Sequence, residues 1–204
     1  MNGAEGRAEH WEDVYRAKHA DETSWFEVEP TTSSALIERA AVTGACIDVG
    51  AGRSTLVDAL LDRGWTSVTV LDLSAAALDT VRERLGDDPR VRIVVGDVLA
   101  AVPAEPVACW HDRAVLHFLT DATDRSRYAA LAAATVQPGG VAVIGCFAPD
   151  GPETCSGLPV HRASAEELAS LFAPNFELEH TARVVHTTPW GTEQPFTWVV
   201  LRRR

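Results

Sequence analysis

The sequence predicts an α/β fold in which a doubly wound sheet of seven strands has its last strand reversed. Two observations support this prediction. Five short apolar segments alternate with segments of helical period between residues 46 and 172, which favours a parallel sheet with helices on both faces. Farther along, two strand-like runs are separated only by residues 189–193. That connection is too short for a parallel crossover, so this final pair is expected to be antiparallel.

Each expected element has its own signal. Glycines 44, 64 and 86 end three of the helices, and Ser164 stands three residues before Glu167 as in a capping box. The cluster 31–34 is expected to cap the second helix. Strands are expected at residues 46–50, 67–74, 91–98, 107–112, 140–147, 176–188 and 194–203. Helices are expected at residues 8–20, 34–44, 54–64, 74–86, 125–140 and 163–172.

The chain length fits one domain with a full core, because 204 residues is an ordinary domain size. Within it we expect residues 1–44 to form a lid and the first helices, and residues 45–204 to form the core. Trp11 and Tyr15 share one face of the first helix, and the aromatic segment TSWFEVEP follows. These aromatic residues predict a lid over a site.

The composition argues against several classes of partner. The net charge of −11 repels a phosphate backbone, so no nucleic-acid partner is expected. No apolar run approaches the ~20 residues of a membrane span, and the N-terminus has no secretory apolar region, so we expect a cytoplasmic protein. The four cysteines form no CxxC pair, so no metal site is predicted. Three of them, Cys46, Cys109 and Cys146, are expected to be buried thiols in strands.

The segment CIDVGAGRS places a glycine turn after the first strand. Its spacing has Thr55 where a dinucleotide fingerprint has its third glycine, and it lacks the Gly-Lys-Ser/Thr of a P-loop. Asp48 would repel a pyrophosphate at this turn. The turn therefore favours a nucleoside that carries positive charge and no phosphate, and S-adenosyl-L-methionine has this chemistry.

Two further acids follow the next two expected strands. Asp72 is placed to accept hydrogen bonds from two ribose hydroxyls, and Asp97 from an adenine amino group. Each acid also has a simpler interpretation, as the start of a helix or as part of a turn. Three acids at three successive strand ends, together with the glycine turn, favour a cofactor site.

The motifs D48-V-G-A-G-R-S54, L71-D72-L-S74, G96-D97-V98 and Q-P-G-G ending at Gly140 resemble the class I S-adenosylmethionine-dependent methyltransferases. That family has a Rossmann-like seven-stranded sheet ending in an antiparallel hairpin. The resemblance implies that the glycine turn lines the methionine portion, and that His111 acts through its backbone beside the adenine. The implied cofactor contacts are Trp25, Asp48, Gly50, Ala51, Gly52, Asp72, Leu73, Asp97, Val98 and His111.

The fourth strand ends in W110-H-D-R-A-V-L-H-F118, which resembles the D-R-G-A-L segment of thiopurine and thiol methyltransferases, with Ala114 in place of the family glycine. The resemblance implies a small-molecule acceptor, such as a thiol or another soft nucleophile. Arg113 is the candidate residue to orient it, and His117 the candidate proton acceptor. Both have simpler interpretations: Arg113 in a salt bridge to Asp112 or Asp124, and His117 as a packed core residue.

Two alternatives remain open. Protein lysine methyltransferases carry a D-K-G-T-L segment at the same place, so lysine N-methylation is one of them. The other is a nucleoside-binding module that has lost its chemistry. Cys155, His161 and His186 are expected to flank the same end of the sheet, and a soft-metal role for them has no supporting spacing.

Overall fold

The computed structural model describes residues 4–204 and contains the expected seven-stranded sheet, in the order β3-β2-β1-β4-β5-β9-β8. All neighbouring strands from β3 to β5 are parallel, whereas β9 is antiparallel to both β5 and β8. The reversed last strand is therefore confirmed. The strands are β1 (Ala45–Val49), β2 (Ser67–Asp72), β3 (Val91–Val95), β4 (Val107–Arg113), β5 (Val136–Phe147), β8 (Phe176–Thr187) and β9 (Glu193–Arg203).

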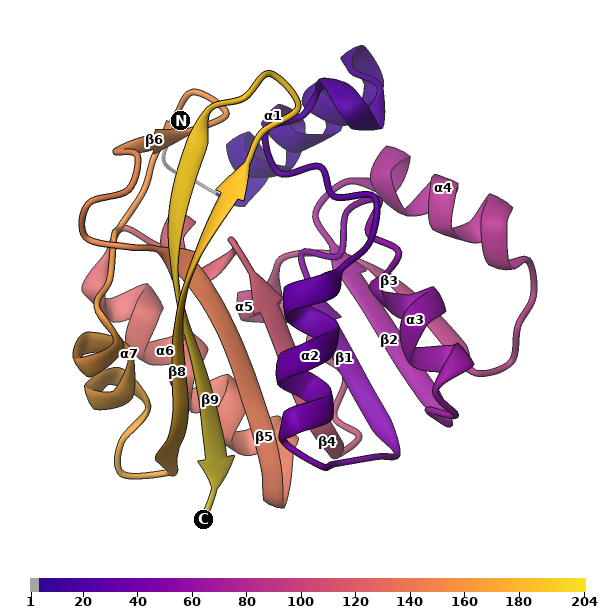
Figure 1. Cartoon of the computed structure of the whole chain (residues 1–204). Coiled ribbons are helices and arrows are strands. Elements are labelled where there is room, and N and C mark those ends of the chain that lie inside the picture. Colours follow the sequence, from indigo (N-terminus) through magenta and orange to yellow (C-terminus); the bar gives the residue numbers. More distant parts are fainter. Residues whose placement is uncertain (1–3) are drawn as a thin grey trace.

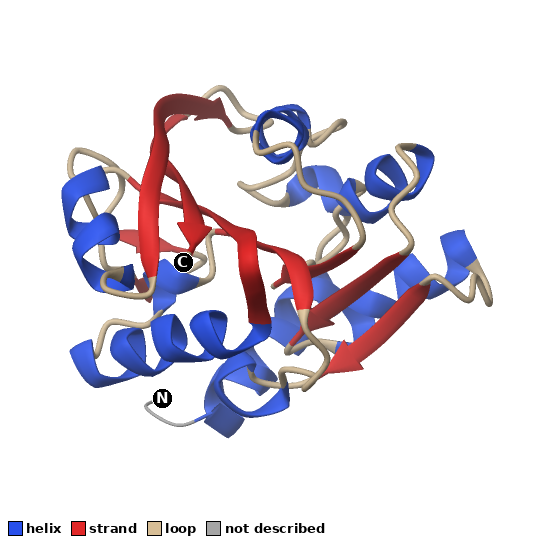
Figure 2. Cartoon of the chain, turned by 90° about the horizontal axis from the view of Figure 1, so that it is seen from below, coloured by secondary structure: helices blue, strands red, loops and turns tan. Residues whose placement is uncertain are grey.

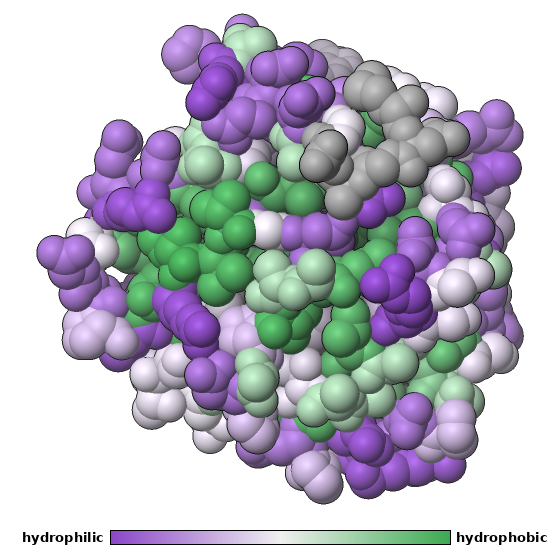
Figure 3. Space-filling model, turned by 180° about the vertical axis from the view of Figure 1, so that it is seen from behind, coloured by the Kyte–Doolittle hydropathy of each residue, from purple (hydrophilic) through white to green (hydrophobic). Residues whose placement is uncertain are grey.

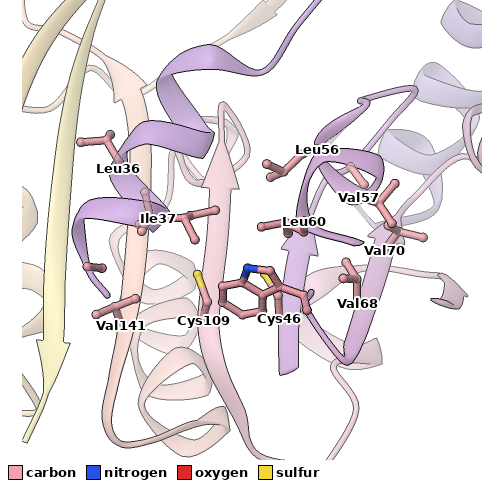
Figure 4. Packing of buried hydrophobic residues seen from close by; sticks show 14 of the residues in the cluster. Leu36, Ile37, Cys46, Leu56, Val57, Leu60, Val68, Val70, Cys109 and Val141 are labelled. Carbon is pink, nitrogen blue, oxygen red and sulfur yellow. The ribbon is translucent and has the colours of Figure 1, made fainter. Parts of the chain in front are cut away.

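Helices cover both faces of the sheet (Figure 2). On one face lie α2 (Thr31–Arg39), α3 (Leu56–Asp62) and α4 (Ala75–Leu85), and on the other lie α5 (Val98–Ala101), α6 (Ala122–Thr135) and α7 (Ala165–Phe172). Alternate strand residues supply the two cores: Cys46 faces the first and Ile47 the second. In the first core, Leu36 and Ile37 of α2 and Leu56 and Leu60 of α3 pack over the strands (Figure 4).

Helix α1 (Ala4–Ala17) packs on neither face. It lies across the carboxyl ends of the parallel strands, at the top of Figure 1. The remaining elements are short. They are the 3-10 turns η1 (Ala20–Glu22) and η2 (Leu116–Phe118) and a small hairpin of β6 (Thr154–Cys155) and β7 (Leu158–Pro159). Among the residues described, no helix has the length and apolar character needed to cross a membrane.

Several boundaries differ from the expectation. Residues 31–34 form the first turn of α2 instead of capping it, and β3 ends before Asp97, which caps α5 by accepting from the Leu99 amide. The expected helix 125–140 stops at Thr135, because the QPGG segment already belongs to β5. There the β4 register passes from Val107–Val136 to Cys109–Val141, so the extra residues bulge out of the ladder.

The burial of the cysteines follows the prediction, with one addition. All four thiols are free and buried, including that of Cys155, which lies in the β6–β7 hairpin. The surface seen from behind combines hydrophilic areas at the rim with hydrophobic residues near its middle (Figure 3). The exposed large apolar residues are Val28, Val95, Leu178, Val185 and Trp190.

Candidate functional site

A pocket opens where the parallel strands β1 to β4 end, beneath α1 and the aromatic segment 23–27. Ligands of doubly wound sheets bind at this edge. The structure brings most of the predicted residues to its wall: Trp25, Asp48, Gly50, Ala51, Asp72, Leu73, Asp97, Val98, His111 and Arg113. Gly52 lies just behind this wall, while His117 lines a different cavity.

The glycine turn has the backbone that only glycine adopts easily. Gly50 and Gly52 have φ angles of 63° and 53°, in the left-handed region. Neither position has room for a side chain: a Cβ on Gly50 would lie 2.0 Å from Val115, and one on Gly52 would lie 2.3 Å from the Tyr15 hydroxyl. The turn is therefore packed between the β4 loop and α1.

Asp48 is buried at the end of β1 and has one oxygen without a partner. Its Oδ1 lies 2.7 Å from Nδ1 of His111, whose Nε2 lies 2.9 Å from the hydroxyl of Ser33. Its Oδ2 has no hydrogen-bond partner among the described residues. An unpaired buried carboxylate oxygen is costly, so it favours a ligand that brings a donor or a cation to the glycine turn.

Asp72 supports the turn from β2. Its Oδ2 accepts from the Gly52 amide and its Oδ1 from the Ser74 amide, both at 2.9 Å. Burial raises the pKa of Asp72 to about 6, against the opposing effect of these amides. Each oxygen keeps a second lone pair, so the carboxylate can also accept from a ligand hydroxyl.

Asp97 contacts α1, which sequence analysis did not predict. Its Oδ2 forms an ion pair with Arg7 at 2.9 Å. Three further hydrogen bonds hold the helix and the residue that follows it in place. Glu12 accepts from the Ser74 hydroxyl at 2.7 Å, and Arg53 donates to the Lys18 carbonyl at 2.7 Å and to that of Tyr15. Helix α1 is thus joined to the ends of β3 and β2 and to the glycine turn.

Arg113 holds the aromatic segment. It donates to the carbonyl of Trp25 at 2.8 Å and forms an ion pair with Glu27 at 3.0 Å. Both simpler pairings suggested for it were wrong. Asp112 instead accepts from the amides of Val115 and Leu116 and from Tyr128, and Asp124 pairs with Arg127.

Glu27 also faces His186 of β8. Their Oε1 and Nδ1 atoms lie 3.6 Å apart, and His186 Nε2 lies 2.7 Å from the Ser24 carbonyl. Cys155 lines the pocket near this group, and burial raises its thiol pKa to about 11 despite Ser24 and Arg113. His161 is not part of the group, because it pairs with Glu167 at 2.6 Å and lines the other cavity.

His117 does not join the predicted site. It is fully buried between the rings of Phe118 and Phe147, and it lines a cavity on the α6 and α7 side of the molecule. Burial, followed by the charge of Arg113, lowers its pKa to about 3. Its ring is therefore neutral at physiological pH, and the structure gives no support to its predicted role as proton acceptor.

Aromatic side chains form the roof of the pocket. Trp11 of α1 meets Trp25 and Phe118 edge to face, with ring centroids 5.6 and 5.1 Å apart, and Tyr15 meets Trp25 at 6.0 Å. Arg7, Ser33, Glu27 and Cys155 also line the pocket and were not predicted as contacts. Of these four, Cys155 was expected at this end of the sheet, and the sequence carried no prediction for the other three.

Comparisons with known proteins give one family model and several solved structures of similar fold. Residues 46–140 match a family model described as a methyltransferase domain. No curated relative matches the sequence. Among solved structures, one reported for the conversion of a disulfide bond into a thioacetal group during echinomycin biosynthesis has a TM-score of 0.76 at 22% identity, covering 96% of this chain and 92% of its own.

Two further neighbours are named as N-methyltransferases. The 1,6-didemethyltoxoflavin-N1-methyltransferase of Burkholderia thailandensis has a TM-score of 0.75 at 20% identity, covering 100% of this chain and 92% of its own. NodS of Bradyrhizobium japonicum, solved with S-adenosyl-l-homocysteine, has a TM-score of 0.70 at 16% identity, covering 94% and 97%. The chain thus has the Rossmann-like fold of these methyltransferases, and residues 46–140 match a methyltransferase domain.

Proposed function

We propose that this methyltransferase takes its methyl group from S-adenosyl-L-methionine and transfers it to a small-molecule acceptor. The observation that carries the proposal is the unpartnered, buried Oδ2 of Asp48 beside the glycine turn. A cationic group is the partner that such an oxygen favours. S-adenosyl-L-methionine has an ammonium and a sulfonium and no phosphate.

The other residues of the pocket fit the same ligand. Asp72 would hold the ribose, and Asp97 with Val98 the adenine. Two of the pocket's arginines already serve protein groups: Arg7 pairs with Asp97, and Arg53 donates to backbone carbonyls. We call the part of the pocket formed by Asp48, Asp72, Asp97 and the glycine turn the cofactor half.

The order of the strands suggests where the acceptor lies. Adenine, ribose and methionine portions would follow β3, β2 and β1 across the sheet, and β4 is the next strand. The remaining wall therefore belongs to the acceptor. We call it the acceptor half, and it consists of Arg113, Glu27, Cys155, Trp25, Phe26 and Phe118. Trp25, which the resemblance implied as a cofactor contact, lies at its border with the cofactor half in this proposal.

When bound, the cofactor supplies a methyl group activated by sulfonium. The chain then has to align a nucleophile within about 3–3.5 Å of that carbon and exclude water. The aromatic roof and the segment bound by Arg113 meet both requirements. They cover the pocket, which excludes water, and they fix the wall that the acceptor contacts. No residue needs to activate the carbon itself.

The covered, aromatic acceptor half favours a small molecule over a protein lysine, which would need an open groove. A thiol or another soft nucleophile remains the proposed acceptor. The position of Arg113 modifies this proposal, since its guanidinium is bound to Glu27 and the Trp25 carbonyl. We therefore assign Arg113 to positioning the acceptor half, and we assign no role in transfer to His117.

Two measurements test the proposal. Calorimetry should detect binding of S-adenosyl-L-methionine and S-adenosyl-L-homocysteine, with NAD and ATP binding far more weakly. Transfer of a labelled methyl group should then occur to small thiols or amines. Binding of NAD without binding of either sulfur nucleoside would contradict the proposed cofactor, and labelling of protein lysines alone would contradict the proposed acceptor.

A further inference from the structure

We propose that His111 and Ser33 are positioning residues for cofactor binding: they hold one oxygen of Asp48 so that the other meets the ammonium group of S-adenosyl-L-methionine. This inference rests on the proposed function and deepens it, because it assigns Asp48 to one of the two cationic groups of the cofactor and names what orients it. The resemblance implied a backbone role for His111 beside the adenine, and the proposal adds a role for its side chain.

Three buried side chains form a hydrogen-bonded chain near the ends of β1 and β4. His111 Nδ1 lies 2.7 Å from Asp48 Oδ1, and His111 Nε2 lies 2.9 Å from the Ser33 hydroxyl. A carboxylate can only accept, so an ionised Asp48 requires the proton on Nδ1. In the neutral ring Nε2 is then the acceptor, and the Ser33 hydroxyl donates to it. The chain therefore fixes Oδ1, while Oδ2 has no partner among residues 4–204.

Packing holds the His111 ring in the same orientation. Asp48 and His111 are register partners on the parallel strands β1 and β4, so their side chains lie next to each other on one face of the sheet. The indole of Trp198 stacks on the imidazole, with ring centroids 6.2 Å apart. A Cβ on Gly145 would lie 2.8 Å from this indole, so Trp198 fills the space beside β5. Rotation of the imidazole would therefore displace core residues.

The free oxygen of Asp48 favours the ammonium over the sulfonium. An ammonium can donate hydrogen bonds to it, whereas a sulfonium has no N–H or O–H to donate. Burial raises the pKa of Asp72 to about 6, and the charge of Asp48 adds to this effect, so the two acids are near enough to act together on a cation at the glycine turn. Arg113 also feels the charge of Asp48, but it pairs with Glu27 instead.

The test compares two nucleosides that differ only in the amino group. They are S-adenosyl-L-homocysteine and its deamino analogue, in which a hydrogen replaces that group. Calorimetry gives the dissociation constant of each, and their ratio is internal to one protein, so a loss of folded molecules does not change it. We expect the wild-type protein to prefer S-adenosyl-L-homocysteine by about 10- to 100-fold, as for a charged hydrogen bond.

Variants of His111 test whether its Nδ1–H orients Asp48. His111→Leu removes this donor and should reduce the ratio to below about threefold, because a buried carboxylate without a donor favours its protonated form. His111→Asn should keep most of the ratio, since the amide nitrogen of asparagine is bonded to Cγ, as Nδ1 is in histidine.

Variants of Ser33 test the far end of the chain. Ser33→Ala leaves Nε2 without its donor and should reduce the ratio about two- to fourfold, whereas Ser33→Thr keeps a hydroxyl and should preserve it. Ser34→Ala is the matched control, since Ser34 is the neighbouring buried serine of α2 and does not line the pocket. It should leave the ratio unchanged.

Three results would overturn the proposal: equal affinity of the wild-type protein for the two nucleosides, an unchanged ratio in His111→Leu, or a ratio in His111→Asn as low as in His111→Leu. If His111→Leu does not fold, the two Ser33 variants decide, and equal ratios in them contradict the proposal. Failure of the proposed function would be recognised separately, because the wild-type protein would then bind neither nucleoside.

Discussion

The two halves of the pocket are held together in different ways. In the cofactor half, Asp72 accepts from Gly52 and Ser74, and Asp97 from Leu99, so most anchors lie within 20 residues of the side chain they hold. In the acceptor half, Arg113 bonds to a carbonyl 88 positions away, and His186 to one 162 positions away. The cofactor half is thus mostly local in sequence, with two long-range contacts, Asp48 to His111 over 63 positions and Asp97 to Arg7 over 90 positions. The two named contacts of the acceptor half are both long-range.

This difference predicts how amino-acid substitutions in each half should affect the shape of the pocket. The cofactor half depends on strand ends and a glycine turn, which the sheet fixes. The acceptor half depends on a few side-chain contacts between the segment around Trp25, the end of β4 and the β8–β9 hairpin. Replacing one such contact can reshape the acceptor wall while leaving the strand ends in place.

The largest expected effect tests whether His117 lies outside both halves. The pKa of His117 is about 3 in the folded state, because of burial, against about 6.5 when unfolded. The unfolded chain therefore binds more protons between these values, and stability is lost as pH falls from 6.5 towards 3. His117→Phe should remove this loss, which amounts to about 3 kcal/mol at pH 4.

Chemical unfolding of wild type and variant at pH 7 and pH 4 measures this effect. The difference between the two proteins isolates His117, since the raised pKa values of Asp72 and Asp112, both about 6, act equally in each. Methyl transfer and cofactor affinity at pH 7 should not change. A folded variant that binds cofactor normally but has lost transfer would return His117 to the acceptor half.

The next effect probes the centre of the cofactor half. Asp48→Asn keeps an oxygen for His111 but removes the charge that faces the glycine turn. Affinity for S-adenosyl-L-methionine should fall by about 10- to 100-fold, as expected for loss of a charged hydrogen bond. Calorimetry measures it, with Asp79→Asn on the exposed side of α4 as the control. Equal affinity would show that Asp48 serves only His111.

A smaller effect asks whether α1 belongs to the cofactor half. Arg7→Ala removes the ion pair to Asp97, which is partly exposed, so affinity for S-adenosyl-L-homocysteine should fall about three- to fivefold. Arg16→Ala, on the same helix with its side chain 70% exposed, should leave this affinity unchanged.

Hydrogen exchange of residues 11–26 should also slow when ligand binds, as predicted for a lid. Identical exchange with and without ligand would make this segment a fixed part of the wall.

The smallest effect concerns the turn between the halves. Ala114 has a φ of 71°, in the left-handed region that favours glycine, and Asp112 holds the turn through the Val115 and Leu116 amides. Ala114→Gly should therefore stabilise the protein by about 0.5–1 kcal/mol. Ala41→Gly, at a φ of 54° outside the pocket, is the matched control and should give a similar gain. A loss of stability in the first variant alone would show that the alanine methyl packs usefully.

The contrast between short-range and long-range contacts also determines which features could be predicted from the sequence. The strand ends and their acids could be predicted from short segments. In CIDVGAGRS, SVTVLDLS and VRIVVGDV an apolar run is followed closely by an aspartate, and in the first and third of them a glycine stands nearby. The left-handed φ of Ala114 matches the glycine that it replaces in the resembling segment.

What escaped prediction depended on distant partners. No local pattern pairs Arg113 with Glu27 or Arg7 with Asp97, so the nearer acids Asp112 and Asp124 were favoured instead. The QPGG segment predicted the end of a helix, and its role as a bulge within β5 depends on the register with β4. His117 stands four residues from Arg113, but the turn at Ala114 directs the two side chains to different cavities.

The position of β9 has a consequence for synthesis of the protein. This strand lies between β5 and β8 although it follows both in sequence, and Trp198, Val199, Val200 and Leu201 are buried within it. While the ribosome is still making residues 193–203, β8 has no strand to pair with, and one side of β5 stays open. His186 therefore cannot support the segment around Glu27 in a nascent chain. The acceptor wall should form last, after the cofactor wall already has its strands.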